Sequence, residues 1–162
     1  MKEELPEYLT MLDFQLPLEN SLSRLEEGVY LNDIIINFML RVFEKTAVSD
    51  DLCDKVTFMN SYFYTHLSEP SQHSDEKMLR ILRKKLTRET CFIVIPINLL
   101  KENHWSLAII SNLNLSLNTE ETELDINTPA IIYLDSMFKI SSETLQVLQR
   151  VVRLSEIVFP KQ

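Results

Sequence analysis

The residues of this chain that could carry out chemistry are a histidine and an aspartate, each at one end of an apolar run. His104 opens the run HWSLAIIS, and Asp135 closes the run AIIYLD, 31 residues later. If the two runs are neighbouring strands, both side chains lie at the same end of one sheet. A carboxylate that accepts a hydrogen bond from an imidazole fixes its tautomer and stabilises the imidazolium, as in a nucleophilic triad. On spacing alone, a purely structural histidine and a strand-end aspartate remain the favoured alternative.

A triad also needs a nucleophile, and the chain has two cysteines. Cys91 immediately precedes the run FIVIPI, a position where a cysteine usually acts as a small hydrophobic residue. Cys53 lies in the acidic segment SDDLCD, whose negative charge disfavours a thiolate. We therefore expect neither cysteine to be the nucleophile. Their spacing does not match a metal site, and without a signal-peptide pattern we expect both to remain reduced thiols.

Three strands are expected in the second half of the chain. Residues 92–97 are β-branched and aromatic, and Pro96 suggests an end or an edge of that strand. Residues 104–111 and 130–135 are the other two strands. Between them, residues 112–128 are polar and low in aromatic residues, which indicates a surface insertion.

Helices are expected before and after these strands. Asn32 or Asp33 can cap the run 34–43, which we expect to form a mostly buried helix. The aromatic residues of 56–67 recur near the helical period, so a second helix is predicted there. Residues 75–89 form an amphipathic pattern, with Met78, Leu79, Leu82 and Leu86 facing inward.

The last helix is expected over 141–154, where two serines provide capping groups. Its apolar residues Leu145, Leu148 and Val152 recur at helical spacing. Helices followed by strands indicate an α+β domain. Residues 1–27 are expected to form an N-terminal arm, and 28–162 the domain itself.

Composition limits the classes of partner. A chain of 162 residues with 45% hydrophobic residues is ordinary for one globular domain. Its net charge of −8 argues against general binding of nucleic acid or of anionic membranes. No apolar stretch is long enough to predict a membrane span.

Four segments, in order, carry a family resemblance: YLNDIIINF, MNSYFYTHL, FIVIPINLLKENHWSLAII and IIYLDSM. Together they resemble the ubiquitin-like-protein-specific cysteine proteases, the sentrin (SUMO) proteases of the Ulp family. The resemblance extends from about Leu25 to about Leu154 and looks most like the branch that trims poly-SUMO chains. It implies a papain-like α+β fold, with helices N-terminal to a small central sheet.

The resemblance also implies roles for individual residues. His104 corresponds to the family's general base, and Asp135 to the carboxylate that orients it. Trp105 and Tyr30 correspond to the two aromatic residues that flank a narrow tunnel for the Gly-Gly tail of the modifier. Glycines have no side chains, so flat aromatic walls can close on the tail backbone and exclude branched residues. Without the resemblance, both aromatic residues would be expected to lie in the core.

One part of the family's pattern is missing from this sequence. The nucleophile lies in a Gln-x₅-Asp-Cys-Gly block after the aspartate, and no such block occurs before Gln162. We therefore expect a partial protease domain, a fragment or short form without the C-terminal catalytic-cysteine segment, that is inactive alone. The alternative is a catalytically inactive module that binds a ubiquitin-like modifier.

The expected partners are SUMO or another ubiquitin-like modifier and its conjugates, with no nucleic acid and no membrane. The resemblance implies no metal and no cofactor. The expected location is the nucleus or the cytoplasm. The sequence predicts neither the modifier nor the oligomeric state.

Overall fold

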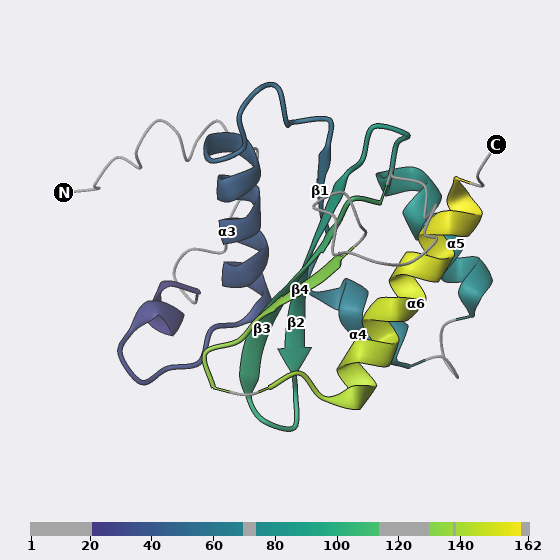
Figure 1. Cartoon of the computed structure of the whole chain (residues 1–162). Coiled ribbons are helices and arrows are strands. Elements are labelled where there is room, and N and C mark those ends of the chain that lie inside the picture. Colours follow the sequence, from purple (N-terminus) through teal and green to yellow (C-terminus); the bar gives the residue numbers. More distant parts are fainter. Residues whose placement is uncertain (1–20, 70–73, 114–129, 138, 160–162) are drawn as a thin grey trace.

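The computed structural model describes residues 21–69, 74–113, 130–137 and 139–159. The described residues form a sheet with helices on both sides, as Figure 1 shows. One helix, α3 (Asp33–Thr46), lies on one side of the sheet. Three helices, α4 (Tyr62–Ser68), α5 (Asp75–Lys85) and α6 (Ser142–Val158), lie together on the other side. This arrangement confirms the predicted α+β class.

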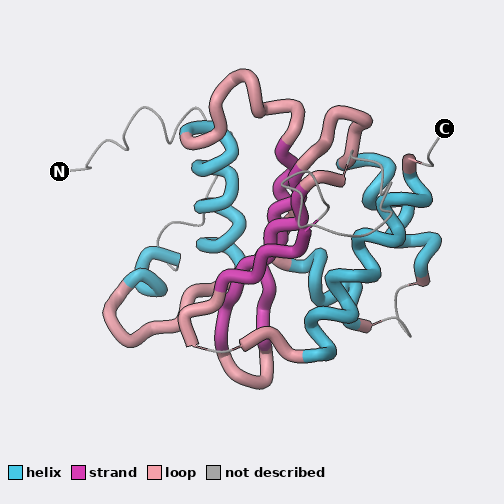
Figure 2. The backbone as a smooth tube through the Cα atoms, in the orientation of Figure 1, coloured by secondary structure: helices cyan, strands magenta, loops and turns pink. Residues whose placement is uncertain are grey.

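The sheet has the strand order β1-β2-β3-β4. These strands are β1 (Val56–Phe58), β2 (Phe92–Leu99), β3 (His104–Ser111) and β4 (Ala130–Leu134). β1 pairs in parallel with β2, whereas β2–β3 and β3–β4 are antiparallel. The antiparallel β3–β4 pairing ends at Leu107 and Leu134, so the first residue of β3 lies beside the chain that follows β4. That corner of the sheet contains the candidate site. Figure 2 shows the strands in magenta.

The helices α3 and α6 begin at side-chain caps that the sequence predicted. Asn32 Oδ1 accepts a hydrogen bond from Ile35 N (3.0 Å) at the start of α3. Ser141 Oγ does the same for Thr144 N (3.0 Å) at the start of α6. Each cap satisfies one of the backbone N–H groups that a helix leaves without an internal partner.

A short 3₁₀ helix, Leu22–Leu25, precedes α3. Among the described helices, none has the length and apolar character needed to cross a membrane.

The core lies between the sheet and the helices α4, α5 and α6. The sheet contributes the face that carries Ile93, Ile95, Ile97, Ala108 and Ile110, all fully buried. The helices contribute the buried apolar side chains Phe63, Leu67, Met78, Leu82, Leu148, Val151 and Leu154. Of the three residues whose spacing predicted α6, Leu148 is buried, whereas Leu145 and Val152 are only partly buried. The inward residues predicted for 75–89 are confirmed, since Met78, Leu82 and Leu86 are buried and Leu79 packs against the same cluster.

The prediction that residues 34–43 form a mostly buried helix is only half right. The helix is present, but Ile35 is its one buried residue, while Met39 is 38% and Phe43 47% exposed. The reason is that α3 lies on the side of the sheet opposite α4, α5 and α6, and has few neighbours among the described residues.

The prediction of a helix over 56–67 is wrong for its first part. Residues Val56–Phe58 form β1, and the helix begins only at Tyr62. A strand of three residues shows no reliable period in the sequence, and its parallel partner, β2, lies far along the chain.

Pro96 does not end the second strand, which continues to Leu99. The β1 pairing covers only Phe92, Ile93 and Val94, so at Pro96 the β1 side of β2 is already an edge. The missing N–H of proline therefore breaks no pair, as expected for an edge position. Most of the predicted arm 1–27 and insertion 112–128 lies outside the described residues.

Candidate functional site

A tight connection between β2 and β3 positions His104. The chain turns at 100–103, and Asn103 has a φ of 47°, in the left-handed region. Asparagine adopts this conformation more readily than most residues, because its short polar side chain can hydrogen-bond to the nearby backbone. His104 follows as the first residue of β3, at the edge of the apolar core.

The His104 and Asp135 side chains are in contact, as the sequence predicted. Nε2 of His104 lies 2.8 Å from Oδ1 of Asp135. The imidazole is 12% exposed and the carboxylate 1%. Because the buried carboxylate occupies Nε2, proton transfer to or from a substrate at His104 would use Nδ1. This is the geometry of a base held by a carboxylate, although the roles themselves remain predictions.

Two further donors contact the Asp135 carboxylate. The Tyr133 hydroxyl donates to Oδ2 at 2.9 Å, and the backbone N–H of Met137 donates to Oδ1 at 2.7 Å. Burial raises the pKa of Tyr133 above its ordinary value, and the hydrogen bond to Asp135 also raises it. Tyr133 is therefore a protonated donor at neutral pH. We did not predict this contact from the sequence, although the alternation of a strand places residues 133 and 135 on one face.

Trp105 lies next to the segment that precedes α3. Its Nε1–H donates to the carbonyl oxygen of Leu31 at 2.9 Å. Tyr30, the residue before Leu31, is 66% exposed. Tyr30 is therefore not a core aromatic residue, and Trp105 is only partly buried. The two predicted tunnel residues thus belong to adjoining segments, with Trp105 directly following His104.

Side-chain contacts with the start of α4 hold the start of α3. Asn37 Nδ2 donates to Ser61 Oγ at 2.9 Å, and Ser61 N donates to Asn37 Oδ1 at 2.8 Å. The Tyr62 hydroxyl donates to Asp33 Oδ2, which raises the pKa of Tyr62. The sequence does not predict these contacts, because they join residues of separate elements with no shared period.

Both cysteines lie at the end of the sheet opposite His104. Cys91 O accepts from Leu113 N (3.2 Å), beyond the last residue of β3, whereas His104 is its first. At about 3.3 Å per residue, that strand separates them by roughly 25 Å. Cys53 is exposed, and its Sγ donates to Asp50 O at 3.0 Å, ahead of β1. Distance thus supports the prediction that neither thiol serves His104.

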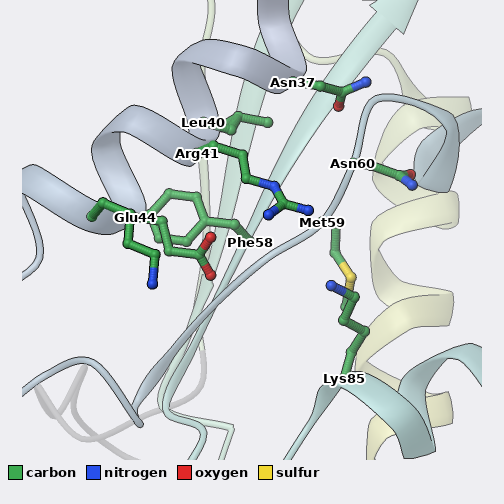
Figure 3. A pocket seen from close by; sticks show the side chains of 9 residues that line it. Asn37, Leu40, Arg41, Glu44, Phe58, Met59, Asn60 and Lys85 are labelled. Carbon is green, nitrogen blue, oxygen red and sulfur yellow. The ribbon is translucent and has the colours of Figure 1, made fainter. Parts of the chain in front are cut away.

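A separate pocket of about 490 Å³ lies between α3 and the β1–α4 connection. Figure 3 shows Asn37 and Arg41 of α3 on one side of it, with Asn60 and Lys85 on the other. Its lining has no imidazole and no thiol, so it is distinct from the His104 corner. Among the residues that the structure describes, no cluster of His, Cys, Asp or Glu is suited to a metal ion.

Comparison with known proteins places this geometry in a family. A model of the "Ulp1 protease family, C-terminal catalytic domain" matches residues 29–157. A solved structure titled "Crystal structure of the de-sumoylating protease" superposes with a TM-score of 0.68 at 21% identity. That match covers 89% of this chain and 53% of the other, and it shows the shared fold.

Relatives by sequence include Ubiquitin-like-specific protease 2 of Schizosaccharomyces pombe, 30% identical over 79% of this chain. Sentrin-specific protease 7 of Homo sapiens is 29% identical over 53% of it. The chain spans 24% and 9% of the lengths of these two proteins. Because the family model covers residues 29–157, which is most of the sequence, the chain belongs to the Ulp1 protease family.

Proposed function

We propose that this chain provides the base, the orienting carboxylate and the tail-binding aromatic residues of a SUMO-specific cysteine protease. The observation that carries the proposal is the 2.8 Å contact between His104 Nε2 and Asp135 Oδ1. It lies at the strand ends where the family resemblance assigns the two roles. Names of relatives that specify sentrin or ubiquitin-like proteins support the choice of substrate.

The proposed reaction cleaves the bond that follows the Gly-Gly end of the modifier. A thiolate attacks the glycine carbonyl carbon, and His104 donates a proton from Nδ1 to the leaving amine. Water then hydrolyses the thioester, with His104 taking a proton from it. Asp135 stabilises the imidazolium throughout. This chain supplies the proton-transfer residues, and we propose that the thiolate comes from a cysteine other than Cys53 and Cys91.

The proposed tail channel rests on Tyr30 and Trp105. Tyr30 is exposed, and the Trp105 indole is fixed to the Leu31 carbonyl next to it. Together they can bracket a glycine backbone beside the imidazole. In the finer form of the proposal, the substrates are poly-SUMO chains and the protein acts in the nucleus. The similarity to Sentrin-specific protease 7 supports the assignment to that branch.

A fluorogenic SUMO reporter, with the dye on the C-terminal glycine, tests the proposal. We expect the chain to bind the reporter, seen as a rise in anisotropy, without releasing the dye. Without a thiolate beside His104, no acyl-enzyme can form. A reporter that does not bind would contradict the proposal. Dye release that is lost on Cys91→Ala or Cys53→Ala would show that one of these thiols is the nucleophile.

The second candidate is a modifier-binding module without catalysis. The distance of both thiols from His104 favours it for this chain acting alone, since the proposed tail channel does not depend on them. The sequence of the longest transcript distinguishes the two candidate functions. An in-frame Asp-Cys-Gly block that restores turnover supports the protease, whereas a stop after Gln162 supports the binding module.

A further inference from the structure

In the proposed function the Asp135 carboxylate must be ionised, although its side chain is only 1% exposed and lies against the His104 imidazole. A buried carboxylate remains ionised only when hydrogen-bond donors replace the lost water. Each of its two oxygens therefore needs a donor.

The two oxygens are satisfied from different sources. Oδ1 faces His104 Nε2 at 2.8 Å and accepts from the backbone N–H of Met137 at 2.7 Å. Oδ2 accepts from the Tyr133 hydroxyl at 2.9 Å. Rotation about the Cβ–Cγ bond moves both oxygens, so the contacts at Oδ1 oppose it in part. The donor at Oδ2 adds a contact on the other oxygen and restricts the rotation further.

Tyr133 is well placed to be that donor. It lies two residues before Asp135, on the same face of β4, and packs against the core. Its strand partner is Ala108, a fully buried residue of β3 with a small side chain. The ring is therefore anchored by packing that does not involve the site, while its hydroxyl reaches the site.

We propose that Tyr133 is a positioning residue that holds Asp135 Oδ2 and thereby fixes the carboxylate toward His104. Tyr133 touches neither the substrate nor the imidazole in this role, and acts through Asp135. The catalytic meaning of the contact rests on the proposed function. The contact itself can be tested without any turnover.

The test follows the His104 Nε2–H proton by ¹⁵N-resolved NMR in the full 162-residue chain, kept dilute enough to be monomeric. The rate at which this proton exchanges with water rises when its hydrogen bond to Asp135 opens more often. We expect Tyr133→Phe to accelerate the exchange by about tenfold or more. Tyr64→Phe is the matched control, because it removes a buried hydroxyl that bonds Thr144 and not Asp135. We expect less than about a twofold change there.

A double-variant cycle separates positioning from a general loosening. If Tyr133 acts through Asp135, then Tyr133→Phe should change nothing further in an Asp135→Asn background. An unchanged rate in Tyr133→Phe alone, or an equal acceleration in both backgrounds, would overturn the proposal. If Tyr133→Phe fails to fold, 3-fluorotyrosine at position 133 provides a stronger donor. Slower exchange is then expected, and an unchanged rate would contradict the proposal.

Discussion

At the level of single residues, buried hydroxyls are part of both the core and the candidate site. The Tyr64 hydroxyl bonds Thr144 Oγ1 at 3.2 Å and joins α4 to α6, while Tyr133 bonds Asp135. Burial is the main cause that raises the pKa of both phenols. His104 and Asp135 could be paired from their positions at strand ends only together with the family resemblance, since spacing alone favoured a structural role. The contact of Tyr133 with Asp135 could not be predicted. A tyrosine in an apolar strand gives no indication of which group its hydroxyl will bond.

These two tyrosines predict loss of stability at alkaline pH. Their folded-state pKa values lie above the unfolded value of about 10, so the stabilisation is complete below pH 10 and is lost as pH rises through the folded values. We expect the melting temperature to fall from about pH 10 upward. Calorimetry of Tyr64→Phe Tyr133→Phe should show a shallower fall. An equally steep fall in that variant would contradict the assignment.

At the level of elements, predictions succeeded where a period spans a whole element. The helices at 75–85 and 142–158 and the strands at 104–111 and 130–134 follow their apolar patterns. β1 could not be predicted, since three residues joined to a distant partner have no local pattern. The exposure of α3 was also missed, because an apolar sequence does not specify what will cover it.

The polar contacts of α3 predict a measurable effect at Trp105. Asn37→Ala removes both bonds to Ser61, whose backbone N–H is then left without that acceptor. We expect a loss of about 1–3 kcal/mol in the free energy of unfolding. Because Trp105 is the only tryptophan and bonds Leu31, its emission should shift to longer wavelength as the start of α3 moves.

Thr46→Ala is the control for this experiment. It removes an exposed hydroxyl on the same helix, which bonds Val42 O at 2.8 Å. In this variant, the Trp105 emission and the free energy of unfolding should stay close to those of the unchanged chain. If Asn37→Ala leaves the Trp105 emission unchanged, the contacts with α4 do not position the Leu31 segment.

At the level of the whole molecule, the two faces of the sheet differ. One face is covered by α4, α5 and α6, whereas Ile132 and Leu134 on the other face are 46% and 50% exposed. Phe43 of α3, on that side of the sheet, is 47% exposed. Exposed apolar side chains on one side of a sheet favour association. In the described sheet β4 is an edge strand, and strand edges also favour association.

We therefore expect the isolated 162-residue chain to self-associate, with an apparent mass that rises with concentration in light scattering. Replacing Ile132 and Leu134 by serine should reduce the association. Ile157→Ser, a change at a 55% exposed residue of α6, should not. A monomer that melts cooperatively at all concentrations would show that this face is covered in solution.

The most direct test of the proposed tail-binding site is calorimetric titration of the chain with SUMO that either carries or lacks the terminal Gly-Gly. Removal of the two glycines should weaken binding by about tenfold or more, and so should Trp105→Ala. Because both changes remove the same contact, the two together should weaken binding little more than either one alone. Phe43→Ala, a change at an exposed aromatic residue of α3, should leave binding unchanged. Affinity that depends on neither the glycines nor Trp105 would contradict the assignment of this corner as a tail-binding site beside His104.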